Sequence, residues 1–134
     1  MTYDRKFVVC AFAYAIFGMC VGIYMGESMN HKQLVTHAHV LLVGFVVSFI
    51  YGLIHKLWLF EVHHGLARIQ FYLHNVAAVA MFSGLFFLYG DVLPEATVGP
   101  ILGASSVGVL AGALLMMYMI LVSPGSNLND SLES

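Results

Sequence analysis

The sequence is poor in charged residues, which excludes an ordinary water-soluble domain. Only 9% of its 134 residues are charged, whereas 60% are hydrophobic. Soluble domains have about 25% charged residues, because their surfaces must face water. The composition therefore predicts an integral membrane protein, and no nucleic-acid partner is expected.

Cysteine is also scarce, and its placement excludes two kinds of covalent link. Cys10 and Cys20 both lie inside the first apolar run, so on one helix they are too far apart for a disulfide. No Cys-x-x-Cys-His motif occurs, which excludes the usual covalent attachment of a c-type haem. The first run also lacks the small-residue cleavage site of a signal peptide, and we expect it to be retained as a membrane span.

Long apolar runs are what the sequence has in abundance. There are four, each near the ~20 residues that a helix needs to cross ~30 Å of hydrocarbon. They cover residues 7–26, 34–55, 69–90 and 98–122. Short connections make sequential helices antiparallel neighbours. We therefore predict an all-α, integral membrane four-helix bundle that forms one domain over residues 1–123, followed by a polar tail over residues 124–134.

The few basic residues indicate how the bundle is oriented. Arg5 and Lys6 precede the first span, and Lys56 and Arg68 fall between the second and third, whereas the other side has only Lys32. Basic residues gather on the cytoplasmic side of membrane proteins. We expect a multi-pass protein of the cytoplasmic (inner) membrane, surrounded by its lipid, with both termini in the cytoplasm and a second helix that runs inward.

Small residues repeat every four positions on the first and fourth runs. Such ladders let helix backbones approach closely where lipid provides no hydrophobic driving force, so we expect tight helix packing there. The residues are Gly18, Gly22 and Gly26 in the first run, and Ala104, Gly108 and Gly112 in the fourth.

Two of the seven histidines, His37 and His39, begin the second run. An ionisable side chain in hydrocarbon is costly unless it meets a partner or a ligand. Residues two apart on a helix differ by ~200° in direction, so this pair cannot ligate one ion and must serve two different cavities. Neutral imidazole is a strong ligand for iron, zinc or copper, and haem iron suits an apolar interior best.

The paired histidines also carry a resemblance to a known family. The stretch "HAHVLLVGFVVSFIYGLIHKLW" is similar to the tenth helix of the catalytic subunit of haem-copper oxidases, most of all the C-type enzymes. The next run, "IQFYLHNVAAVAMFSGLFFLYG", resembles the helix that follows it there. The matching positions of the first stretch are His37, His39, Gly44, Phe45, Phe49 and Gly52.

The resemblance implies that His37 and His39 are ligands of haem iron, because in the family the two histidines of this helix bind two different haems. The three histidines that hold the oxidase copper have no counterpart, and His74 does not match the histidine of the following oxidase helix. We therefore expect a small b-type cytochrome that binds haem b and transfers electrons or senses redox state, rather than an oxygen-reducing enzyme. A quinone or respiratory-chain redox proteins are its expected partners.

The same geometry predicts an oligomer. His37 and His39 face opposite sides, so one protomer cannot clamp a haem between them, and the missing ligand must come from another copy. By resemblance, three four-helix units make up the twelve helices of the oxidase subunit, which favours a homotrimer with a haem at each interface. A homodimer that pairs the same histidine from both chains is the alternative.

Four further histidines belong to the cytoplasmic end: His55, His63, His64 and His74. His63 and His64 are either solvated surface or, with Glu61 or His55, a zinc or copper site. Such a site defines a second function, in which copper or zinc passes from the outer histidine pair toward this cluster. A third is an accessory or assembly subunit of a respiratory oxidase without a cofactor. We also expect His74 and Asn75 to make hydrogen bonds between helices.

Overall fold

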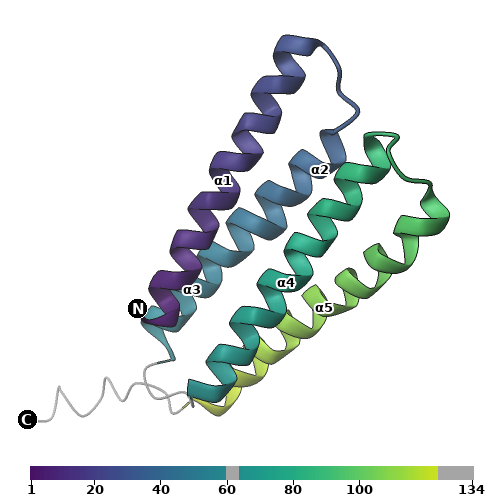
Figure 1. Cartoon of the computed structure of the whole chain (residues 1–134). Helices are drawn as coiled ribbons and strands as arrows, with labels where there is room; N and C mark the ends of the chain where they lie inside the picture. The colour runs from purple at the N-terminus through teal and green to yellow at the C-terminus, as the bar shows by residue number, and fades with distance from the viewer. Residues whose placement is uncertain (60–63, 124–134) are drawn as a thin grey trace, which may run out of the picture.

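The structure, a computed structural model, describes residues 1–59 and 64–123. Within these ranges the chain is all-helical, without strands, and forms four long helical segments (Figure 1). The elements are α1 (Tyr3–Ser28), α2 (Leu34–His39), η1 (Val40–Val47), α3 (Ser48–Leu57), α4 (His64–Tyr89) and α5 (Glu95–Val122). The short elements α2, η1 and α3 run on without a break as one second segment, and each of the four segments is long and apolar enough to cross a membrane.

The four predicted runs are therefore confirmed as helices, but three of them begin earlier than predicted. The clearest case is α4, which begins at His64 rather than Ile69. Its first turns carry polar residues such as Arg68, which lie beyond the apolar run but still keep helical backbone hydrogen bonds. The length of an apolar run thus predicts the part of a helix that lies in the hydrocarbon of the membrane, and not the length of the whole helix.

The helices pack as two close pairs joined through the middle. The N-terminal helix α1 lies along the second segment, α4 lies along α5, and α4 also touches the second segment (Figure 1). Two apolar clusters fill the contacts. One is built on Phe7, Tyr51 and Phe71, and the other on Val40 and Phe82.

The small-residue ladders pack tightly only in part. A Cβ atom added at Gly108 would lie 2.8 Å from the Ala77 Cβ, so α4 and α5 approach there as expected. A Cβ at Gly18 would lie 2.6 Å from Leu41. Gly26 has nothing within 4 Å, so the last member of the first ladder makes no contact with another helix of the same chain.

The outer surface of the helices is apolar, as a lipid environment requires. Large hydrophobic side chains on all four segments are exposed, among them Ile23, Leu42, Val76 and Leu121. A soluble bundle would carry polar residues at these positions. The four apolar helices and their apolar outer surface indicate a multi-pass membrane protein.

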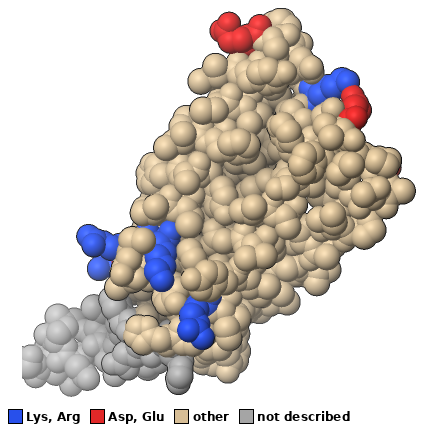
Figure 2. Space-filling model, in the orientation of Figure 1, with Lys and Arg blue, Asp and Glu red and all other residues tan. Residues whose placement is uncertain are grey.

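Charge separates the two ends of the bundle. Figure 2 shows lysine and arginine side chains near the start of α1 and the end of α3, and acidic side chains at the far end. We call the first of these the basic end. It holds the start of α1, the end of α3, the start of α4 and the end of α5, as an even number of antiparallel segments requires (Figure 1).

At the opposite end Lys32 forms an ion pair with Asp91. The hydrogen bond to Asp91, and secondarily its negative charge, raises the pKa of Lys32 above its usual 10.5. The raised pKa means that this contribution to stability is complete below pH 10.5 and is lost as the pH rises through the higher folded-state value.

Because both side chains are exposed, at 61% and 71%, we expect Lys32→Gln to leave the thermal midpoint at pH 7 and physiological salt unchanged within error. Thermal melts of the two proteins in detergent check this. A clear fall in the midpoint would show that the pair holds the α1–α2 connection in place.

Candidate functional site

The second segment changes its helical geometry directly after the histidine pair. It is α-helical to His39, becomes a π-helix over Val40–Val47, and returns to α-helix at Ser48. π-Helical turns are rare and occur frequently at functional sites. The π-helix begins directly after His39, so the irregular backbone and the two histidines indicate the same candidate site.

His37 is held against α1. Its Nδ1 lies 2.8 Å from the Gly18 carbonyl oxygen, and its ring lies over Gly22, where an added Cβ would be only 2.9 Å from the ring Cε1. The N–H at Nδ1 donates to the carbonyl, which leaves the lone pair on Nε2. The glycine ladder of α1 thus provides the space in which this imidazole lies.

His39 has the same arrangement with a partner on its own helix. Its Nδ1 lies 2.8 Å from the carbonyl oxygen of Val35, one turn earlier. A carbonyl that accepts from Nδ1 fixes the ring orientation and makes Nε2 a better ligand. Among the described residues, some buried side-chain nitrogen and oxygen atoms lack a hydrogen-bond partner. The Nε2 atoms of His37 and His39 are not among them.

The two histidines flank the buried side of α2. Thr36 and Val40, at 1% and 0% exposure, face the bundle interior, and His37 and His39 lie on either side of them, each half-buried. In the α-helical part of the segment the ~200° separation therefore holds. The two side chains therefore leave α2 in different directions, and helix geometry does not bring them to one site within a protomer.

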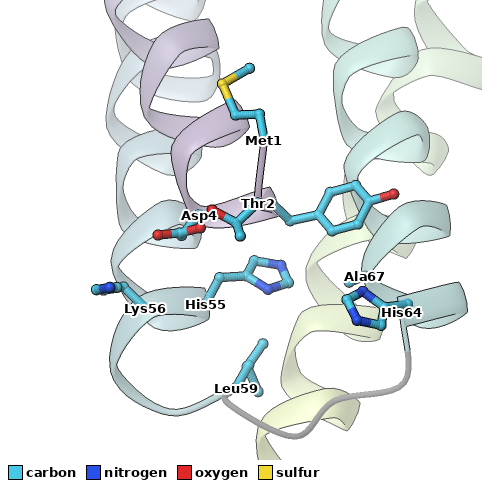
Figure 3. A pocket seen from close by; sticks show the side chains of 9 residues that line it. Met1, Thr2, Asp4, His55, Lys56, Leu59, His64 and Ala67 are labelled. Atoms are coloured by element: carbon cyan, nitrogen blue, oxygen red, sulfur yellow. The ribbon is translucent and has the colours of Figure 1, made fainter.

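The other predicted histidines lie toward the basic end. His55 and His64 line one pocket there (Figure 3). His74 is 0% exposed, and its Nε2 lies 3.0 Å from the Ser48 Oγ. His63 and Glu61 lie outside the described residues. Among the residues that the structure describes, no group of three or more His, Cys, Asp or Glu side chains is placed to hold a metal.

Expected hydrogen bonds between helices are present. Besides the bond between His74 and Ser48, the Tyr14 hydroxyl donates to the Asn75 Oδ1 at 2.8 Å. Ser48, Tyr14 and Gln70 were not predicted from the sequence as polar groups of the interior. Ser48 and Tyr14 bond to His74 and Asn75, whereas Gln70 is buried without a partner among the described residues. Their signal was available, since each is a polar group inside an apolar run, where such groups need a partner.

The contact between Gly22 and His37 gives a sharp test of the site. We expect Gly22→Ala to displace the His37 ring and weaken any ligand bound at its Nε2, because the new methyl group would overlap the ring. Gly26→Ala is the matched control, one turn further along α1 with nothing within 4 Å. The ring resonances of ¹⁵N-labelled His37 in the nuclear magnetic resonance spectrum measure both, and identical resonances in the two variants would contradict this placement of His37.

No family model, curated protein or solved structure matches the chain significantly.

Proposed function

We propose that the protein is a small membrane b-type cytochrome in which His37 and His39 hold haem b. The observation that carries this proposal is the pair of Nδ1 contacts to carbonyl oxygens, both at 2.8 Å. They leave Nε2 of each ring free to bind a ligand, which is how a histidine that holds a metal is usually oriented.

The two imidazoles fit haem in other respects as well. They are half-buried in an apolar helical protein, so the apolar edge of a porphyrin finds matching surroundings. When bound, haem supplies reversible one-electron chemistry. The protein orients the two imidazoles, which would hold the haem iron and leave no position for oxygen. Electron transfer or redox sensing follows, with a quinone or respiratory-chain proteins as redox partners.

The placement of the ligands supports a cyclic assembly. Because His37 and His39 lie on different sides of α2, each haem needs His37 from one protomer and His39 from another. We propose a homotrimer with three such interfaces, as the resemblance to the oxidase subunit favours. The basic end faces the cytoplasm in this proposal, which puts the histidine pair near the outer face of the cytoplasmic membrane.

The direct experiment is an optical spectrum, with a pyridine haemochrome assay, of protein purified from haem-replete cells. We expect a Soret band and a low-spin b-type spectrum. A colourless protein overturns the proposal. Elemental analysis of the same sample then distinguishes the alternatives, since copper or zinc without porphyrin indicates metal handling, and no metal indicates an accessory subunit.

A double substitution at the other end tests the assignment of the ligands. We expect His63→Ala combined with His64→Ala to leave the spectrum unchanged, because His64 lines the basic-end pocket and not the surroundings of His37 and His39. The absorbance spectra of oxidised and reduced protein check this. A shifted or missing Soret band would mean that haem is bound at the basic end.

A further inference from the structure

The interior of the bundle near the basic end contains polar atoms that have no partner in the protein. Gln70 and His74 are both 0% exposed. Neither amide atom of Gln70 has a hydrogen-bond partner within the described part of the chain, and the same holds for the Nδ1 of His74 and the Nε2 of His55. The backbone of Val43 lies beside His74, but no hydrogen bond of normal geometry joins it to Nδ1. Buried polar groups in proteins are nearly always hydrogen-bonded, if not to the protein then to ordered water.

His55, Gln70 and His74 follow one another into the bundle, with the apolar Phe7 ring packed against both imidazoles. Gln70 lies beside His55, although no hydrogen bond of normal geometry joins them. The Phe7 ring stacks on His55 with ring centres 5.5 Å apart, and its centre is 6.2 Å from that of His74. On α4, Gln70 and His74 are one turn apart and face the same side. We call Ser48, His55, Gln70 and His74 the inner polar cluster.

The inner polar cluster is connected to a pocket that opens at the basic end. This pocket has a volume of about 450 Å³ and is lined by His55, His64, Asp4 and Ala67, among others (Figure 3). In Figure 3 the His55 ring projects into it from α3, opposite His64 on α4. His55 lines this pocket and also lies beside Gln70, so the polar series begins at the pocket wall.

At its inner end the series stops. The Ser48 Oγ forms a hydrogen bond with Nε2 of His74, at 3.0 Å. Beyond Ser48, the side chains of Val40, Ala78 and Met81 belong to an apolar cluster. The series therefore reaches from one face into the bundle and does not cross it.

We propose that the inner polar cluster is a hydrated proton-uptake path that leads from the basic-end pocket, past His55 and Gln70, to His74. Water in the pocket gives a proton to Nδ1 of His55, and the enclosed Nε2 of the same ring releases one to the water inside the bundle. Gln70 does not titrate, but its amide donates and accepts hydrogen bonds and so holds water between the two imidazoles. The proton passes through this water to Nδ1 of His74, while Ser48 can accept from, or donate to, Nε2 on the other side of the ring.

The surroundings on every packed helix suit this role. The α5 helix contributes only uncharged groups, and a Cβ at its Gly112 would lie 3.5 Å from the His74 Cβ. Within residues 1–59 and 64–123, the charged and titratable groups around the two imidazoles and their pocket are the Met1 N-terminus, Asp4 and Tyr3 at the start of α1, Tyr51 and Lys56 on α3, and His64 on α4.

The path does not depend on haem, so it can be tested whether or not the proposed function holds. In a background with Cys10→Ser and Cys20→Ser, we expect Gln70→Cys to react with a small cationic methanethiosulfonate, because that reagent needs water and a thiolate. Ala78→Cys is the matched control, since it is equally buried on the same helix but lies in the apolar cluster. We expect labelling about tenfold faster at position 70, and only with reagent added on the side of the basic end.

A second measurement follows the proton itself. With ¹⁵N-histidine-labelled protein, we expect the ring N–H of His74 to exchange with water in the nuclear magnetic resonance spectrum, and Gln70→Leu to slow that exchange at least about tenfold by removing the group that holds the water. Met81→Leu, an apolar exchange on α4, leaves it unchanged. Equal, slow labelling at positions 70 and 78, or an exchange rate unaffected by Gln70→Leu, would show that the inner polar cluster is dry and overturn the proposal.

Discussion

His37→Ala and His39→Ala are each expected to abolish haem retention. In the proposed cytochrome each variant would lack one of the two imidazoles that hold the iron, so haem should be lost rather than bound slightly more weakly. Purified variants should have less than about a tenth of the wild-type Soret absorbance per chain. The measurement is the haemochrome content of protein from cells grown under the same conditions.

Two controls distinguish ligation from misfolding. His31→Ala removes an exposed histidine of the preceding connection and should keep the wild-type haem content. Added imidazole should restore a six-coordinate spectrum to His37→Ala or His39→Ala, because it can occupy the cavity that the side chain left. A variant that keeps the normal spectrum without imidazole removes its residue from the ligand set.

Co-expression of the two variants under different tags should restore haem that neither variant holds alone. In a cyclic trimer, an interface between His37 of one chain and His39 of the next stays intact only when neither of these two residues is substituted. Every trimer that contains both kinds of chain has one such interface. Complexes captured through both tags should therefore hold about one haem per three chains, against about one per chain for the wild type.

The dimer with a two-fold axis gives a different result. Pairing the same histidine from both chains across a single haem makes one of the two single variants fully competent and the other inactive. In that case the tandem-purified complex would contain two chains, as mass measurement in detergent would show. Either observation would exclude the trimer, while a haem-free mixed trimer would exclude ligation between His37 and His39.

Much of the fold could be predicted from the sequence because membrane helices follow apolar length. The same holds for the opposite directions of His37 and His39, which need only the regular geometry of α2. The π-helix could not be predicted, since Val40–Val47 is a uniform apolar run with no local signal. It is held in place by packing between helices. Tyr14 lies so close to Gly44 that an added Cβ there would be 2.8 Å from its Cγ.

The inner polar cluster was missed for a related reason. The sequence shows Gln70 and His74 as polar residues in an apolar helix, but not that Ser48 of another helix meets one of them and that Gln70 meets no protein partner. Such pairing depends on the rotation of each helix about its own axis. That rotation is determined by contacts between segments, so it becomes visible only in the assembled bundle.

The π-helix also fixes how the two ends of the second segment are turned relative to each other. A regular helix turns ~100° per residue, whereas a π-helix holds an additional residue in each turn and therefore turns less. The direction of Ser48 toward His74 is thus set by the number of residues between it and His39. A single deletion within Val40–Val47 would let the α-helix form again and turn one end away from its partners. This stretch should therefore accept changes of side chain far more readily than changes of length.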